Sequence, residues 1–540
     1  MTMSTVQNSG QSPLKVTYQE DPRVAEEQRD TEYGGHIVPP GARVSRGALA
    51  LSASSLISGL VWLFYGALVA SLVGTHEAMI GMLVSLAAFI VINWPLAKWG
   101  TRHGLDATLM SRRVFGFSGA ALISLLTAAN VTYYAVFESS VVASAMKGYL
   151  GGPNLRIWYL IVVAAMLPLM RGSVQTWMGK LNGILLPLFL AGLVASVVVT
   201  GVNSGWNMNW TSTKGVIPPQ ALGIPGWLFT CVLYMGTWLQ MPLTLDFSRF
   251  GRPQDLGFHR GVSFGFVFFA FSYFINGVVG IFLVQASGLD VAVNEAGVVS
   301  AILKSLGIWG LLFVLVTQVR INTLNYYLAS MHWQRLAKRY LRLDFSRLTW
   351  VLLTGIVVFG LMLTDVFGYL QRALMWQGVF IVSWVGIVMT HLILTREDRE
   401  GGPEFRPGRL PSVTAGLAAW LAASVIGIAI AENKAAFPVA SNLAPLITLV
   451  ASVMLYLLVR RQVLRSMPNR GDDPRHAVKD PWGAYIGCHV CDRSYLVMEM
   501  DSDPSAGGAG ICAVCAMNRG PFRLACLPRE SRPTVVSDVH

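Results

Sequence analysis

The stretch LLFVLVTQVRINTLNYYLASM, Leu311 to Met331, is long and apolar enough to cross a bilayer, yet it carries an arginine near its middle. About 20 predominantly apolar residues suffice for a spanning helix. A cationic side chain at the centre of such a helix costs roughly 2.5–3.5 kcal/mol on insertion scales, so Arg320 is expected to face a cavity or a partner charge. The stretch therefore predicts a membrane helix whose polar residues have a role inside the bilayer.

Helical geometry separates the polar residues of this stretch into two faces. Gln318, Asn322 and Asn325 share one face, whereas Arg320 lies about 140° from Asn325, next to Thr317. One face offers neutral amides that suit an uncharged polar ligand, and the other offers a fixed positive charge. A structural clamp between Arg320 and a carboxylate of another helix is the alternative. We favour a functional site, because three amides beside a buried cation exceed what packing needs.

Composition places the chain among integral membrane proteins. It has 540 residues, of which 53% are hydrophobic and 13% charged. We attribute the net charge of +12 to cytoplasmic loops, and we expect no nucleic-acid partner because no module of that kind is visible. The polar first 46 residues contain no secretory signal, and residues 17–43, rich in charge, Gly and Pro, are expected to be disordered.

We expect an all-α protein with twelve spans. Their ranges are 47–73, 77–98, 114–146, 156–171, 180–201, 226–247, 260–287, 307–331, 347–367, 373–395, 412–432 and 440–459. Lys and Arg gather in alternate connections, which predicts a multi-pass protein of the cell inner membrane with both termini cytoplasmic.

Two spans contain interruptions at corresponding places. Ser58-Gly59 interrupts the first span, and Gly236 with Pro242 interrupts the sixth. If the first ten spans form two inverted repeats of five, these positions match, and matched interruptions indicate a substrate site near the bilayer midplane. Ordinary Gly/Ser packing or a proline kink is the alternative interpretation.

The third span carries a polar stripe that ends in a carboxylate. Thr127, Asn130, Tyr134 and Glu138 fall on one helical face. A glutamate this deep in an apolar helix marks a proton or cation path, or else it pairs with a buried cation. Arg320 is the first candidate partner for Glu138 and Arg249 the second. A structural salt bridge without a role in transport stays open.

Three stretches in chain order together resemble the nucleobase–cation symporter family, which includes purine–cytosine permeases and the hydantoin transporter. They are GLDATLMSRRVFGFSGA at 104–120, Pro242 followed by Asp246-Phe247-Ser248-Arg249-Phe250, and the asparagine-bearing eighth span. The resemblance covers residues 30–460. It implies a LeuT-like fold, with a five-plus-five inverted repeat and two further helices. It also implies a planar heterocycle held between aromatic residues of helices 3 and 6 and read by amides of helices 3 and 8.

Carried onto this chain, the resemblance makes Tyr134 the stacking residue of helix 3 and Trp238 its helix-6 partner. Glu138 takes the place of a helix-3 amide, and Asn325 that of the helix-8 amide. The full set of expected substrate-binding residues is Tyr134, Glu138, Trp238, Gln240, Asn322 and Asn325. Aromatic faces with convergent polar groups suit a flat ligand with N–H and C=O edges. Two departures are that Tyr134 replaces a more usual tryptophan and that Trp238 sits one residue nearer the Asp-Phe-Ser-Arg motif.

The coupling residues depart furthest from the family pattern. Sodium-using relatives place a hydroxyl about five residues before the helix-8 asparagine, where this chain has Arg320. A guanidinium is effectively always charged, so it would repel sodium and could stand in for it. We therefore expect sodium-independent transport, either proton-coupled through Glu138 or uncoupled. The candidate coupling residues are Glu138, Arg320 and Thr317.

The C-terminal part carries two close cysteine pairs, Cys488 with Cys491 and Cys512 with Cys515. The spacing, C-x2-C, twenty residues, C-x2-C, fits a zinc ribbon. Redox-active or incidental thiols are the alternative, and Cys526 is a spare thiol or an alternative ligand. Four thiolate ligands leave no open position for catalysis, so we expect structural zinc with a regulatory or partner-binding role.

The expected organisation has five parts: a cytoplasmic tail at 1–46, a transporter domain at 47–460, a linker at 461–484, a zinc ribbon at 485–530 and a tail at 531–540. The favoured function is a permease that imports a nucleobase-like heterocycle. Its partners would be the substrate, a coupling proton or cation, the lipid bilayer and a cytoplasmic protein at the tail. The alternative is a ligand-binding sensor that signals through the cysteine-rich tail. A membrane enzyme is disfavoured because no nucleophile–base pair or catalytic metal set is visible, and no organic cofactor is expected.

Overall fold

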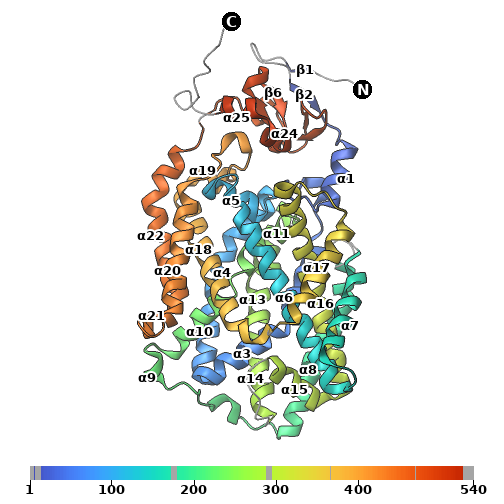
Figure 1. Cartoon of the computed structure of the whole chain (residues 1–540), viewed down its shortest axis with the longest axis vertical. Coiled ribbons are helices and arrows are strands. Elements are labelled where there is room, and N and C mark those ends of the chain that lie inside the picture. The colour runs from blue at the N-terminus through green and yellow to red at the C-terminus, as the bar shows by residue number, and fades with distance from the viewer. Residues whose placement is uncertain are drawn as a thin grey trace.

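The computed structural model describes residues 5–6, 14–171, 179–287, 295–364, 366–468 and 470–526. Most of its helices run along the long axis of an elongated bundle, and a small β-containing module sits on one end (Figure 1). We call that end the terminal face, because α1 (Pro22–Asp30) and residues 485–526 lie there. The opposite end, with α9 (Pro219–Leu222) and α15 (Glu295–Leu306), is the distal face.

Every predicted span coincides with apolar helical structure. Eight helical stretches are long and apolar enough to cross a membrane: α4 (Thr75–His103), α6 (Ala121–Leu150), α8 (Gly179–Ser204), the run Pro253–Ala286, α16 (Ile308–Leu336), Met375–Leu394 of α18 (Val366–Leu394), α20 (Ala415–Glu432) and α22 (Ala444–Arg465). Two bent pairs raise the number to ten within the described residues. The fourth and ninth predicted spans are the shorter α7 (Leu155–Met166) and α17 (Arg347–Met362), so the fold is confirmed and the count of twelve stays a prediction.

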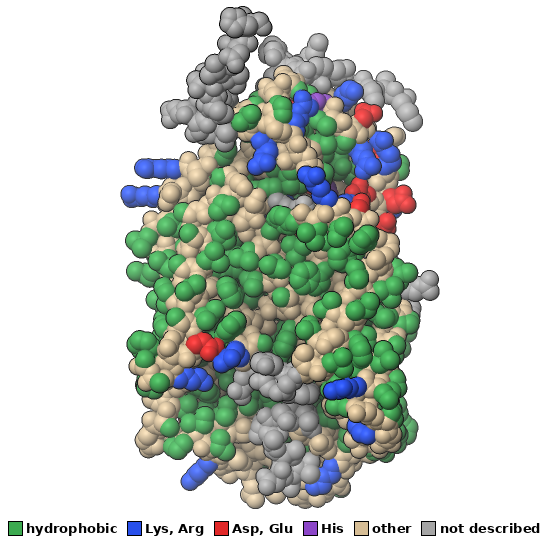
Figure 2. Space-filling model, in the orientation of Figure 1, with side chains coloured by type: hydrophobic (Ala, Val, Ile, Leu, Met, Phe, Trp, Pro, Cys, Tyr) green, Lys and Arg blue, Asp and Glu red, His purple; other side chains and the backbone are tan. Residues whose placement is uncertain are grey.

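Apolar side chains cover the middle of the bundle, and Lys and Arg side chains lie toward its ends (Figure 2). Many of the exposed side chains are large and aliphatic, for example Val91, Ile184 and Leu458. Such a belt is expected where hydrocarbon tails surround the protein. The molecule is therefore a multi-pass membrane protein.

Both predicted interruptions are present. In the first span, α2 (Arg46–Ala53) and a 3-10 turn through Ser58 meet α3 (Leu60–Val73) at an angle of 43°. In the sixth, α10 (Gly226–Met235) and α11 (Gln240–Ser248) meet at 46°. The similar bends at matched positions fit an inverted repeat.

Side chains satisfy the backbone where the first span unwinds. Asn276 Nδ2, at the start of α14 (Asn276–Ala286), donates to the Ile57 carbonyl at 2.7 Å, and Trp62 Nε1 donates to the Leu56 carbonyl at 2.6 Å. Backbone polar groups inside a bilayer need such partners, since lipid offers none. The break is therefore held open by residues on two different spans.

The N-terminal segment differs from the expectation of disorder for residues 17–43. Strand β2 (Leu14–Thr17) pairs antiparallel with β3 (Tyr485–Gly487), α1 follows it, and Val38 is fully buried. That prediction was wrong because ordering partners such as β3 lie far away in the sequence, where local composition cannot reveal them. Residues 1–4 and 7–13 lie outside the described part of the chain.

The C-terminal module combines β3, β4 (Ser494–Leu496), β5 (Asp501–Asp503) and β6 (Ala509–Ile511) with α24 (Ala513–Asn518) and α25 (Gly520–Cys526). Its apolar core includes Val16 and Val24 of the N-terminal segment. Residues 527–540, the end of the expected ribbon and the expected final tail, lie outside the described residues.

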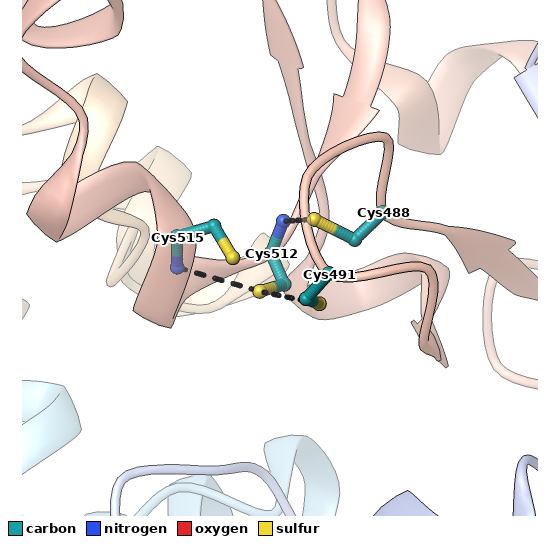
Figure 3. Close-up of side chains that lie close together, drawn as sticks. All are labelled: Cys488, Cys491, Cys512 and Cys515. Carbon is teal, nitrogen blue, oxygen red and sulfur yellow. Dashed lines mark hydrogen bonds between the residues drawn. The ribbon is translucent and has the colours of Figure 1, made fainter.

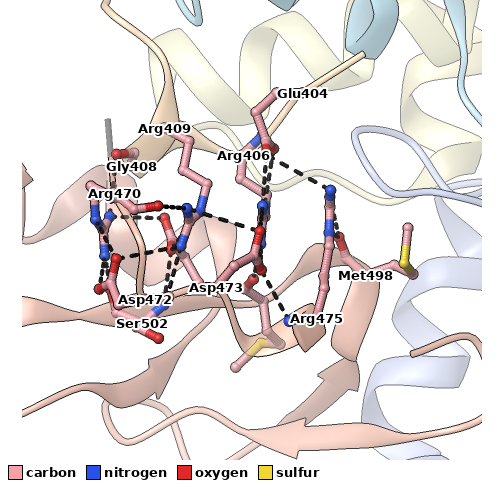
Figure 4. Close-up of polar contacts among 12 residues, drawn as sticks. Glu404, Arg406, Gly408, Arg409, Arg470, Asp472, Asp473, Arg475, Met498 and Ser502 are labelled. Atoms are coloured by element: carbon pink, nitrogen blue, oxygen red, sulfur yellow. Dashed lines mark hydrogen bonds and ion pairs between the residues drawn. The ribbon is translucent and has the colours of Figure 1, made fainter. Parts of the chain in front are cut away.

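Arginine–carboxylate contacts fix this module to the bundle through the expected linker (Figure 4). Arg406 bonds both Glu404 and Asp473 at 2.6 Å, and Arg409 and Arg470 share Asp501. Burial alone would raise the pKa of Glu404, but Arg406 outweighs it and holds that pKa at about 2. Glu404 is therefore charged near neutral pH, and residues 470–475 form a docking contact through these ion pairs.

Candidate functional site

The amide face of the eighth span lies against the third span. Asn322 Nδ2 donates to Ser139 Oγ at 3.2 Å, and Ser139 Oγ lies 3.2 Å from the Tyr326 hydroxyl. Asn322 is therefore partly used in holding α16 to α6, while its Oδ1 atom has no hydrogen-bond partner. Asn325 is also buried, and its Nδ2 atom has no partner.

Glu138 lies at the centre of this face, almost fully buried. A side chain built on Gly59, at the break of the first span, would place its Cβ 3.4 Å from Glu138 Oε1. Gln318 is the neighbouring amide, but no hydrogen bond of normal geometry satisfies either side chain. Unsatisfied buried polar atoms cost free energy and call for an explanation, so the cluster beside two broken spans is a candidate ligand site.

The predicted aromatic residues approach this site from two directions. The Tyr134 hydroxyl accepts from Gln377 Nε2 at 3.1 Å. Trp238 is buried edge-on against Phe89 of α4, with ring centroids 6.4 Å apart. Among the described ring pairs, the rings of Tyr134 and Trp238 do not contact each other. A ligand held between the two rings would require them to be apart. Gln240 is buried at the start of α11.

Gln377 of α18 is a site residue that we did not predict. Its Nε2 atom also donates to the Gly236 carbonyl at 3.3 Å, so it joins the third span to the break in the sixth. Gly378 permits this approach, because a Cβ there would lie 2.8 Å from Gly236 Cα. A lone amide followed by glycine inside the apolar range 373–395 was the available signal.

Arg320 points away from the amide face, and the prediction that it pairs with Glu138 was wrong. Its Nη2 atom donates to the Ser54 carbonyl at 2.9 Å and to Ser54 Oγ at 3.1 Å, and its guanidinium lies 5.5 Å from the Phe189 ring centroid. No ion pair among the described residues joins it to Glu138. Carbonyls that end a helix carry partial negative charge, which attracts the cation to the break instead. Thr317 Oγ1 bonds the Val314 carbonyl of its own helix at 2.7 Å.

The second candidate partner of Glu138, Arg249, is likewise engaged elsewhere. It belongs to a cluster on the terminal face that we call the terminal gate, made of Asp106, Asp246, Arg249, His332 and Arg335. Asp106 Oδ2 lies 3.6 Å from Arg249 Nη1 and 3.4 Å from Arg335 Nη1, and Asp246 Oδ2 lies 3.7 Å from His332 Nε2. Asp246 Oδ1 accepts from the Ala107 amide at 3.1 Å. These contacts join the loop after α4 to the ends of α11 and α16 on that side.

The distal side, in contrast, contains a cavity of about 910 Å³. It is lined by Tyr65 of α3, Val232 and Gly236 at the second break, Met375 of α18 and Pro445 of α22. Gly236 lines this cavity and accepts from Gln377, the partner of Tyr134, whereas Tyr134, Glu138 and Trp238 are not among the lining residues. The cavity therefore extends from the distal face to the break in the sixth span.

The four predicted cysteines meet in the C-terminal module (Figure 3). Their sulfur atoms all lie within 4.8 Å of one another, and Cys491 Sγ lies 4.0 Å from Cys512 Sγ. Tetrahedral zinc with bonds of about 2.3 Å needs sulfurs separated by about 3.8 Å, so the set fits a metal ion. The amides of Cys512 and Cys515 donate to neighbouring cysteine sulfurs at 3.4 Å. Cys526 lies outside the cluster, with its Sγ 3.1 Å from Arg470 Nη1.

No protein-family model and no curated protein matches the sequence. Among solved structures, the chain resembles Mhp1, a nucleobase-cation-symport-1 family transporter, closed with bromovinylhydantoin bound. Identity is 17% and the TM-score 0.63, over 81% of this chain and 96% of that one. For inward-facing Mhp1 the identity is 16% and the TM-score 0.64, over 80% of this chain and 94% of that one. For MhsT in complex with L-phenylalanine the identity is 14% and the TM-score 0.53, over 78% of this chain and 99% of that one. The chain therefore has the LeuT fold, which Mhp1 and MhsT share.

Proposed function

We propose that the chain is a secondary transporter that imports a nucleobase-like heterocycle by alternating access. The observation that carries the proposal is the group of unsatisfied buried amides around Glu138, set between two broken spans. Mhp1, with the same fold, binds a hydantoin, which is a flat ring with N–H and C=O edges. A purine, cytosine, uracil, allantoin or hydantoin has the same chemistry.

In this proposal the ring enters through the distal cavity and lies between Tyr134 and Trp238. Glu138 accepts hydrogen bonds from ring N–H groups, while Asn322 and Asn325 read the remaining edge. Gln240 lies at the start of α11 and completes the site. Gln377 orients the Tyr134 hydroxyl, so it positions the stacking ring. Closure of the distal cavity and opening of the terminal gate would then release the substrate on the other side.

Transport is proposed to be independent of sodium. The Arg320 guanidinium bonds the Ser54 carbonyl at the break, where it supplies the positive charge that a coupling cation would bring. Thr317 bonds its own helix and is a weaker candidate for coupling. Glu138 is the remaining titratable group at the site and would carry a coupling proton.

The terminal face is proposed to be cytoplasmic, in the cell inner membrane. Lys and Arg of the connections gather on this face, as the positive-inside rule requires of a cytoplasmic side. A reducing compartment would also keep the four thiols available as metal ligands. Zinc is the metal that suits four thiolates, and its role there would be structural.

Uptake into proteoliposomes tests the proposal directly. Labelled nucleobases and hydantoins would be offered while sodium and proton gradients are varied separately. We expect accumulation driven by an inward proton gradient, or equilibration without a gradient, and no saturable stimulation by sodium. Binding without uptake would overturn transport in favour of a sensor, and sodium-driven accumulation would overturn the assignment of Arg320.

A further inference from the structure

Residues 32–38, here called the strap, cross the terminal gate. Arg249 Nη1 donates to the Tyr33 carbonyl at 3.0 Å, and Arg249 Nη2 donates to the Glu32 carbonyl at 2.8 Å. The Val38 amide donates to the Gly104 carbonyl at 3.1 Å. Gly34 lies so close to Arg335 that a Cβ there would be 2.3 Å from Nε. The strap therefore touches the ends of the sixth and eighth spans and the loop between the second and third.

The strap is held in a conformation that the chain does not favour by itself. Glu32 and Tyr33 are consecutive residues with φ of 48° and 55°. Left-handed backbone is uncommon for residues other than glycine and persists where surrounding contacts impose it. Contacts from outside the strap must supply that free energy.

The Arg249 bonds supply part of it, and the C-terminal module adds contacts before the strap and within it. Before it, β2 pairs with β3, and Arg493 Nη1 lies 2.7 Å from Glu27 Oε2. Within it, the buried Glu499 carboxylate accepts from the Ile37 amide at 2.5 Å and lies 2.9 Å from His36 Nδ1. The His36 ring also stacks on Tyr495, with centroids 6.0 Å apart.

The strands of the module that carries these contacts lie next to the cysteine cluster. Strand β3 ends one residue before Cys488, and β6 ends one residue before Cys512. A unit of about 40 residues rarely sustains a core without a disulfide, a metal or a partner. Binding of a metal to four thiolates is therefore expected to supply much of the free energy that folds the module.

We propose that the metal-loaded module is a latch that holds the strap across the terminal gate, so that zinc occupancy sets how readily this face opens. Removal of the metal would loosen β3 and Glu499, free the strap, and uncover Arg249 and Arg335. The consequence for transport rate rests on the proposed transporter function, whereas the release of the strap does not.

Hydrogen exchange of the full-length protein in detergent or nanodiscs, read by mass spectrometry, tests the latch without any substrate. Zinc-loaded protein would be compared with chelator-treated protein and with Cys512→Ser, and metal content would be measured in each. We expect metal loss to speed exchange of residues 32–38 about tenfold, with the centre of the bundle unchanged. Metal loss that leaves exchange of the strap unaltered would overturn the proposal.

A second variant separates the latch from collapse of the module. Glu499→Gln weakens the contact to His36 and Ile37 but spares the cysteines, so zinc content should stay at the wild-type level while exchange of the strap rises. Glu26→Gln, an exposed carboxylate on α1, is the matched control and should change neither. Unchanged strap exchange in Glu499→Gln, or an equal rise in the control, would contradict the latch.

Discussion

Buried charges occur in two regions of this molecule, and their surroundings differ. At the terminal gate each carboxylate meets a cation or a backbone amide, as Asp106 does with Arg249 and Arg335. At the bilayer centre Glu138 has no satisfied hydrogen bond, and two nitrogens of Arg320 have no partner. Paired charges stabilise one closed arrangement, whereas unpaired ones leave capacity for a ligand or a proton. The difference indicates that the terminal gate stabilises this conformation, and it makes the surroundings of Glu138 the candidate binding site.

Asp106→Asn is expected to have the largest effect, because it would leave two buried arginines without their carboxylate. Loss of one partner of a buried pair costs about 3–5 kcal/mol. The terminal face should open, and exchange of residues 104–109 should rise while the distal cavity closes. Exchange and thermal melting in detergent measure this. Asp344→Asn, an exposed carboxylate, is the control, and equal behaviour of the two variants would show that the gate is not held by charge.

Glu138→Gln tests the region of unpaired charges. Because Glu138 has no pairing to lose, the variant should fold normally and melt close to the wild type. Uptake should fall about 10–100-fold, since the amide replaces one acceptor oxygen by an NH2 donor that faces a ring N–H, and it cannot carry the coupling proton. Uptake kinetics with and without a proton gradient give the readout. A drop in stability with intact uptake would make Glu138 structural, and Glu400→Gln is the exposed control.

Arg320→Ser is expected to be intermediate. It removes the charge at the Ser54 carbonyl, so uptake should fall about tenfold. Sodium should then restore part of the loss, because a hydroxyl and the carbonyl would offer oxygen ligands to a cation. Arg320→Lys keeps the charge and should stay insensitive to sodium. No sodium response in Arg320→Ser would mean that the arginine does not occupy a cation position.

His36 gives the smallest effect and tests the strap through pH. Burial lowers the pKa of His36, but the Glu499 carboxylate outweighs it, with help from Glu27 and against Arg112, and the net shift is upward. A raised pKa adds stability that is complete below about pH 6.5 and disappears as pH rises through the raised value. Protection of residues 32–38, taken as the exchange rate corrected for the intrinsic pH dependence of amide exchange, should therefore fall above that pH. His36→Gln should abolish this pH dependence of the protection.

Local sequence patterns predicted the spans, the two breaks and the cysteine cluster, because apolar length, Gly59, Gly236 and cysteine spacing act over short distances. They did not predict the partner of Arg320, since a helical wheel gives its direction but not which neighbouring helix end lies there. Gln377 was missed because its role depends on Tyr134 and Gly236, which lie on other spans. The ordered segment 17–43 was missed for the same reason: its composition resembles that of a disordered tail until strand β3 is present.

The pairing of β2 with β3 also has a consequence for synthesis of the chain. The strap is made first, but the strand and the cysteines that hold it are made last, after all the membrane spans. Until that strand and the cysteines have been synthesised, the strap lacks its contacts to the C-terminal module, and the terminal face is held by the charge pairs of the terminal gate alone. A product that stops after the last span would carry the terminal gate without the contacts of the strap to β3 and Glu499. If the module acts as the proposed latch, ordering of the strap is therefore a late step in the folding of the chain.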